Sequence, residues 1–144
     1  MLKLPRDRHD AEVLRQRLTT WTGSYERQDM PEPTRALSVR QPHAEAIMRG
    51  IKKVEYRSST TKIRGRIFIY AGLGRYDAAE ESDWMAEYGI RDVTCDDLPR
   101  GAIVGTVELF DSKEGQWYLC RPERAATLRK PDNRPNPVWF KPFN

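Results

Sequence analysis

Apolar residues recur along this chain with the periods of strands and of a helix. A first strand is expected at residues 35–39, followed by a helix over residues 42–49. Pro42 suits the first turn of a helix, and Gly50 suits its C-terminal end. Apolar side chains of this segment recur at i, i+3, i+4 and i+7, which predicts a helix packed on a sheet. These residues are Ala44, Ile47, Met48 and Ile51.

Further short apolar stretches, separated by turn residues, predict the other strands of one sheet. Residues 66–71 are apolar on both faces, so that strand is expected in the centre of the sheet. The other strands are expected at residues 53–57, 102–111, 115–120 and 138–140, and helices at residues 76–88 and 122–130. About six short strands with few helices predict an α+β fold, a small β-barrel with flanking helices.

Residues 1–33 differ from the rest of the chain and predict an N-terminal extension. Apolar residues at helical spacing indicate an amphipathic helix, and a proline-containing stretch up to residue 33 favours a linker. The apolar residues are Ala11, Leu14, Leu18 and Trp21. One domain is then expected over residues 34–144. The extension either docks on the barrel and covers a sheet edge, or it serves as an arm for self-association or a protein partner.

The charge is distributed unevenly along the chain. Residues 1–66 contain fifteen Lys or Arg against eight Asp or Glu, whereas the second half of the chain is acidic. Seven of the basic residues lie between Arg49 and Arg66, where Glu55 alone opposes them. Such a block supplies a surface for phosphates, but a solvated strand-loop-strand face explains it as well.

Several classes of protein and site are disfavoured. No stretch reaches the ~20 apolar residues that cross a bilayer, and the N-terminus lacks a signal-peptide core. We expect a cytoplasmic protein without a membrane partner. Cys95 and Cys120 form no C-x-x-C pair and are expected as buried thiols. With His9 and His43 they are too few and too far apart for a zinc site, so no metal or cofactor is expected.

Three motifs occur in order along the domain: SVRQP at residues 38–42, GIKKVEYR at residues 50–57 and LPRGAIVGTV at residues 98–107. With these motifs, residues 34–144 resemble the ASCH domain, a family of the PUA-like superfamily. The resemblance implies a PUA-like barrel with a basic cleft that binds RNA or other nucleic acid. It also implies an alternative, because some members are enzymes, among them acetylcytidine amidohydrolases and a ribonuclease.

Residues of the first two motifs and of the basic block are the candidates for binding RNA or single-stranded nucleic acid, with DNA also possible as the partner. Phosphates would meet cations, and a base edge would meet side chains that donate or accept hydrogen bonds. The expected phosphate contacts are Arg40, Lys52, Lys53, Arg64 and Arg66, and the expected base contacts are Ser38, Gln41 and Glu55. His43 either stacks on a base and donates to a phosphate, or it is a polar surface residue.

Strand alternation puts charged and apolar residues of the second motif on opposite faces. The charged face comprises Lys53, Glu55 and Arg57, and the apolar face comprises Val54 and Tyr56. Burial of the apolar pair would leave the charged residues, Arg57 included, facing a cleft or forming surface ion pairs. Tyr56 of this strand is expected in the core. Three aromatic residues elsewhere in the chain are also expected there, namely Tyr70, Trp84 and Phe110.

As an enzyme, the chain would use Lys52 and Glu55. In the amidohydrolases that it resembles, a lysine and a threonine of this strand and a later glutamate belong to the catalytic set. Lys52 occupies the lysine position, but Glu55 stands in place of the threonine. The later glutamate would have to be Glu81 or Glu108, by rough position alone. The resemblance therefore supports a binding module more than a hydrolase.

Overall fold

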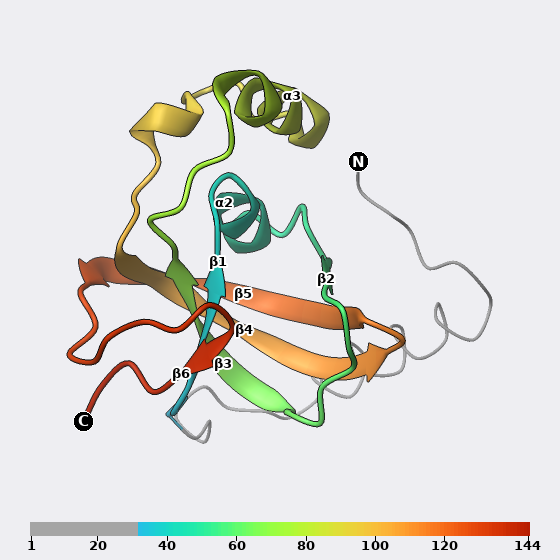
Figure 1. Cartoon of the computed structure of the whole chain (residues 1–144), viewed down its shortest axis with the longest axis vertical. Coiled ribbons are helices and arrows are strands. Elements are labelled where there is room, and N and C mark those ends of the chain that lie inside the picture. The colour runs from blue at the N-terminus through green and yellow to red at the C-terminus, as the bar shows by residue number, and fades with distance from the viewer. Residues whose placement is uncertain (1–31) are drawn as a thin grey trace.

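Six strands form one sheet in the order β2-β5-β4-β3-β1-β6 (Figure 1). The computed structural model describes residues 32–144. Neighbouring strands are antiparallel except β1 and β3, which run parallel. The strands are β1 (Ala36–Val39), β2 (Val54–Tyr56), β3 (Gly65–Ala71), β4 (Ala102–Lys113), β5 (Gln116–Arg129) and β6 (Trp139–Phe140). The helices are α2 (His43–Met48) and α3 (Ala78–Tyr88), with the 3-10 turn η2 (Cys95–Asp97). The α+β class is confirmed.

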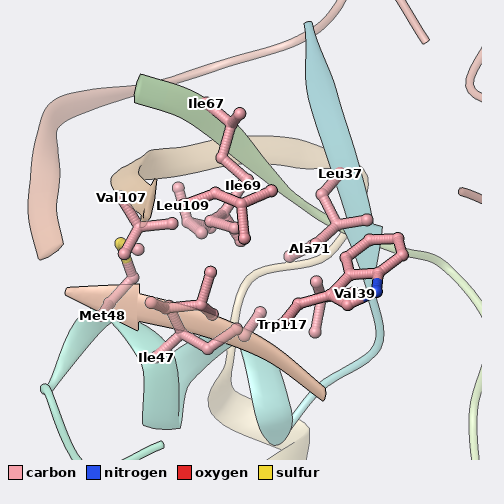
Figure 2. Close-up of a cluster of buried hydrophobic side chains, with 13 residues drawn as sticks. Leu37, Val39, Ile47, Met48, Ile67, Ile69, Ala71, Val107, Leu109 and Trp117 are labelled. Atoms are coloured by element: carbon pink, nitrogen blue, oxygen red, sulfur yellow. The ribbon is translucent and has the colours of Figure 1, made fainter. Parts of the chain in front are cut away.

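Helix α2 forms where the sequence predicts it and packs on one face of the sheet (Figure 2). Its residues Ala44, Ile47 and Met48 are buried in the main core among side chains of β1, β3, β4 and β5. Burying a large aliphatic side chain contributes about 1.5–3 kcal/mol, so this face holds the helix to the sheet. Because only three residues separate the end of β1 from the start of α2, the same packing fixes the turn between them.

The positions of β3 and β5 test two predictions. β3 lies between β4 and β1 and is buried on both faces, so its expected central place is confirmed. The helix predicted over residues 122–130 is wrong, because β5 continues through this segment and pairs with β4. Arg124 lies opposite Gly105, and Arg129 lies opposite Ile103. Pro122 falls where the register shifts, the kind of irregularity at which a sheet tolerates proline.

The sheet curls, but backbone hydrogen bonds do not close it into the predicted barrel. Strands β2 and β6 remain its two edges. Side chains bridge the gap instead: Trp117 of β5 stacks on Trp139 of β6 with ring centroids 5.6 Å apart. Arg57, just after β2, donates through Nη2 to the carbonyl of Ser38 in β1 at 2.8 Å. Within residues 32–144, these side-chain contacts link the ends of the open sheet.

The predicted N-terminal helix falls on residues that the structure does not describe, since the description begins at residue 32. The division into residues 1–33 and 34–144 therefore stays a prediction. Cys95 and Cys120 are buried thiols that are not joined in a disulfide, as expected. Within residues 32–144, neither helix is long and apolar enough to cross a membrane.

Candidate functional site

A cleft of about 410 Å³ opens beside the junction of β1 and α2. Its walls come from the end of β1, the start of α2, the segment around β2, and residues 76 and 84 on either side of the start of α3. Three cations, Arg40, Lys52 and Arg57, line the cleft together with one carboxylate, Glu55. This excess of positive charge favours an anionic ligand.

Glu55 is the centre of an ion-pair cluster in the cleft and is only 7% exposed. Its Oε2 accepts from Arg57 Nε at 2.9 Å and Nη2 at 2.7 Å, and its Oε1 lies 3.3 Å from Lys52 Nζ. Lys52 Nζ also donates to the carbonyl of Val54 at 2.7 Å. Because a carboxylate oxygen has two lone pairs, Oε1 retains the capacity to accept from one further N–H.

Aromatic rings form a second wall of the cleft. The His43 imidazole meets the rings of Tyr76, Trp84 and Tyr88 edge-on, with centroids 5.5, 4.7 and 5.7 Å away. Trp84 and Tyr88 stack on each other along α3. The guanidinium of Arg40 lies over the Tyr76 ring, 5.3 Å from its centroid. The Tyr76 hydroxyl makes no hydrogen bond with residues 32–144, so it is available to a ligand.

His43 is held in its neutral form by this environment. Its Nδ1 and the Tyr88 hydroxyl are joined by a hydrogen bond of 2.6 Å. The pKa of His43 is lowered to about 4, mainly by burial and to a lesser extent by the Lys52 ammonium, while the Glu55 carboxylate opposes the shift. The imidazole therefore adds no positive charge to the cleft near neutral pH.

The low pKa of His43 predicts acid sensitivity of the fold. The unfolded chain protonates His43 near pH 6.5 and the folded chain only near pH 4, so the unfolded state binds more protons between these values. Stability should fall as the pH drops through this window, by at most about 3 kcal/mol from this residue. Urea unfolding of wild type and His43→Phe at about pH 7 and pH 4.5 measures it. Equal losses in both proteins would contradict the assignment.

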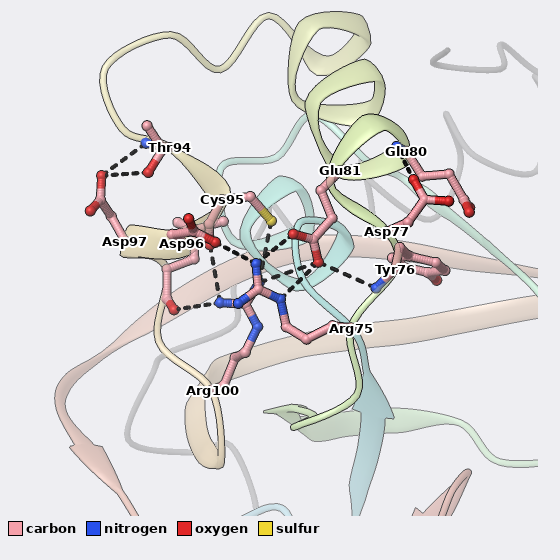
Figure 3. Close-up of polar contacts among 11 residues, drawn as sticks. Arg75, Tyr76, Asp77, Glu80, Glu81, Thr94, Cys95, Asp96, Asp97 and Arg100 are labelled. Carbon is pink, nitrogen blue, oxygen red and sulfur yellow. Dashed lines mark hydrogen bonds and ion pairs between the residues drawn. The ribbon is translucent and has the colours of Figure 1, made fainter.

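The loop that carries Tyr76 is fixed by a second polar cluster, shown in Figure 3. Glu81 is 4% exposed and accepts from Arg75 through both carboxylate oxygens and from the Tyr76 backbone N–H at 3.3 Å. Arg100 lies 3.7 Å from the same carboxylate, and Asp96 accepts from Arg75. The hydrogen bonds from Arg75 lower the pKa of Glu81. We call these four side chains, Arg75, Glu81, Asp96 and Arg100, the Glu81 cluster.

The sequence model of the ASCH domain matches residues 37–118, which contain all of the cleft except Pro137. The chain belongs to the ASCH domain family. Activating signal cointegrator 1 from Homo sapiens is 42% identical over 79 residues, which cover 52% of this chain and 14% of that protein. Activating signal cointegrator 1 from Mus musculus gives the same identity and coverage. This chain thus matches a small part of those relatives.

The ASCH motifs bring most of the expected site residues into the cleft. Arg40 is exposed at its rim, and the carbonyl of Ser38 accepts from Arg57 across the cleft lining. The Ser38 hydroxyl donates to the carbonyl of Asn136 at 2.5 Å. The expected residues that line the cleft are Ser38, Arg40, His43, Lys52, Glu55 and Arg57.

Four expected contacts lie away from the cleft. Gln41 is fully buried, where its Oε1 accepts from the backbone N–H of Glu45 in α2 and its Nε2 donates to the Pro99 carbonyl. Arg66 is directed at Thr106 and Glu123. The remaining two are exposed: Lys53 borders a smaller hollow beneath α2, and Arg64 lies 3.6 Å from Asp111.

Residues of β2 alternate between its two faces as expected, but the predicted burial of Tyr56 is wrong. Tyr56 is 39% exposed, whereas Glu55 lines the cleft and is buried. The ion pairs with Lys52 and Arg57 make this burial tolerable. Tyr56 and Trp84, expected in the core, line the cleft, whereas Tyr70 and Phe110 are buried as expected.

Sequence reasoning missed Tyr76 altogether, and no motif marks it. Its place depends on the Glu81 cluster, which joins residues 75–81 to η2 and to the third ASCH motif. The two glutamates suggested as later catalytic groups, Glu81 and Glu108, do not line the cleft. Glu81 is occupied by the cluster, and Glu108 lies buried on β4.

Proposed function

We propose that this ASCH domain binds single-stranded nucleic acid, RNA in the first place, by taking one unstacked base into the cleft. The observation that carries the proposal is the buried carboxylate of Glu55, held between Lys52 and Arg57 beside an aromatic wall. Proteins that read single strands stack unpaired bases on aromatic rings and hydrogen-bond to the base edges. The cleft offers both kinds of contact.

Glu55 is the group that would read the base edge. A carboxylate is unfavourable in a basic cleft if the ligand is bound through its phosphates alone. Its position is fixed by two cations, and Oε1 can accept from the amino or imino group of a base, as acidic side chains accept from cytosine N4. We therefore assign Glu55 to base preference and not to overall affinity.

Arg40 would supply the main phosphate contact of the cleft. Its side chain is exposed and forms no hydrogen bond or ion pair with residues 32–144. Arg57 and Lys52, in contrast, are committed to Glu55 and to backbone carbonyls, so their role is to hold the carboxylate. The nucleic-acid partner that the ASCH family implies supports the same assignment.

A hydrolase of nucleic acid or of a modified nucleoside is the second candidate function. The observation that favours it is the 3.3 Å separation of Lys52 Nζ and Glu55 Oε1 within a cleft, where the two groups can act on one ligand. A catalytic role predicts product formation, whereas a binding module predicts none. One experiment therefore has to measure binding and turnover together.

Glu55→Gln keeps the shape of the side chain, removes its charge and replaces one acceptor by a donor. We expect overall affinity for RNA and DNA oligonucleotides to change by less than about fivefold. Preference among oligonucleotides that differ in one unpaired base should collapse, because one hydrogen bond to a charged group contributes about 1.5–3 kcal/mol. Fluorescence anisotropy with an oligonucleotide panel and chromatography for products measure both.

Asp83→Asn is the matched control, since Asp83 is exposed on α3 and the change removes the same charge away from the cleft. Loss of turnover in Glu55→Gln with unchanged binding would establish the hydrolase instead. Unchanged preference and no turnover in either protein would make Glu55 a structural ion-pair partner and refute the assignment.

A further inference from the structure

A second hollow, of about 490 Å³, adjoins the cleft, and we call it the side groove. It is bordered by the loop that precedes α3, through Leu73, and by the segment that follows β5, through residues 130–135. The cleft uses the same two segments, through Tyr76 and Pro137. Leu73 and Tyr76 are three residues apart on the first segment, and residues 135 and 137 are two apart on the second. The cleft and the side groove therefore follow each other along both segments.

Arg40 marks the junction of the two hollows. Its side chain lies over the Tyr76 ring in the cleft, and it also touches the loop at Gly74. A Cβ built on Gly74 would lie 2.7 Å from Arg40 Nε, so this close approach depends on the glycine. Gly74 lies between Leu73 of the side groove and Tyr76 of the cleft, which puts the Arg40 cation beside the passage between them.

The side groove carries cations that no other residue in the described part of the chain neutralises. Lys130 and Arg134 are exposed, and neither has a hydrogen bond or an ion pair with residues 32–144. Arg100 also borders the groove but is directed at the carbonyls of Cys95 and Leu98. One carboxylate, Asp132, faces the same hollow, so the groove remains basic.

The segment that presents these cations is held in place at several points. The backbone N–H of Asp132 donates to the Pro142 carbonyl at 2.8 Å, and Asn133 Nδ2 donates to the Lys141 carbonyl at 2.8 Å. Ser38 of β1 donates through its hydroxyl to the carbonyl of Asn136. Lys130 and Arg134 therefore project from a segment that is anchored next to the cleft, and little ordering is needed on binding.

We propose that the strand whose base enters the cleft continues into the side groove, where Lys130 and Arg134 bind its phosphates. This inference rests on the proposed function and extends its ligand to a segment of several nucleotides. Leu73, 70% exposed at the groove, offers an apolar surface for a neighbouring base. Residues 130–137 lie outside the ASCH match at residues 37–118, so the family match does not carry this surface.

The test compares a short and a long single-stranded RNA with the same central sequence, about three and about twelve nucleotides long. The double variant Lys130→Ala with Arg134→Ala should bind the long RNA about 25-fold more weakly at 0.1 M salt, the factor given by two lost contacts. The salt dependence of its affinity, as the slope of log K against log salt, should become shallower by about 1.4. Binding of the short RNA should change by less than about twofold.

Arg91→Ala is the control for charge, because Arg91 is exposed and lies away from both hollows. A long-RNA affinity that the double variant retains, while Arg40→Ala still weakens it, would overturn the side groove and leave the cleft intact. An equal loss for short and long RNA would also overturn it, since the cations would then act on the cleft ligand. Wild-type protein that binds neither RNA would refute the proposed function and the groove together.

Discussion

Tyr76→Ala is expected to weaken binding of single-stranded nucleic acid by about 5- to 150-fold, because base stacking on one aromatic ring contributes about 1–3 kcal/mol. The Tyr76 ring stands in the wall of the cleft, with Arg40 on it and His43 at its edge. Its loss removes the ring and the support for the Arg40 guanidinium together. Anisotropy titrations with a labelled oligonucleotide measure the change.

A second variant separates the contributions of the Tyr76 ring and hydroxyl. Tyr76→Phe keeps the ring and removes the hydroxyl. Its affinity for nucleic acid should fall by less than about tenfold, the effect of losing one neutral hydrogen bond. Thermal unfolding of both variants establishes that the fold is intact, which is expected because Tyr76 is only half-buried on a loop. Affinity of Tyr76→Ala within about twofold of wild type would exclude stacking on this ring.

The strand, turn and helix of the first two motifs are predictable because their local signals agree. Pro42, the apolar stripe of α2 and Gly50 all specify one short helix, and the structure has it at His43–Met48. The structural role of Gln41, in contrast, is not predictable from the local sequence. Its polarity suggests a ligand contact, yet its amide is used inside the protein, between α2 and Pro99, which only tertiary structure decides.

The second half of β5 has no comparable local signal. Pro122 and the charged residues around it suggest a helix, but the segment is a strand because it pairs with β4, with two shifts of register. Strand pairing of this kind depends on residues distant in sequence, so a local pattern does not reveal it. The same reasoning applies to the open sheet, whose gap is bridged by Trp117 and Trp139.

The candidate site also has a part that the sequence predicts and a part that it does not. Lys52, Glu55 and Arg57 lie within six residues of one another, and their grouping follows from the motif, although the inward direction of Glu55 does not. The aromatic wall is assembled from α2, α3 and the loop between β3 and α3. The backbone N–H of Tyr76 donates to Glu81, a contact that the sequence does not reveal.

Glu81→Ala is therefore expected to affect both stability and binding. The change removes the carboxylate beside the partly buried Arg100 and leaves the Tyr76 N–H without its acceptor. We expect the free energy of unfolding to fall by about 2–3 kcal/mol, below the full cost of breaking a buried ion pair because Arg75 reaches water. The melting temperature should fall by roughly 10 °C.

The pH dependence of this stability loss tests whether the charge of Glu81 causes it. Because the hydrogen bonds from Arg75 lower the pKa of Glu81 in the folded state, its stabilisation is present above the ordinary value of 4.5 and is lost as the pH falls through the lowered value. The difference in stability between wild type and Glu81→Ala should thus be full near neutral pH and shrink below about pH 4. A difference that is constant with pH would mean that the side chain acts by packing alone.

Binding tests whether Glu81 acts through Tyr76. If Glu81 positions the ring, Glu81→Ala alone should weaken nucleic-acid binding, whereas adding it to Tyr76→Ala should weaken binding by little more than Tyr76→Ala alone does. The loss of stability, in contrast, should persist in the double variant, because Arg100 and the loop backbone still lack their acceptor. Independent, additive losses of affinity in the two single variants would show that Glu81 supports the cleft by a route that does not pass through Tyr76.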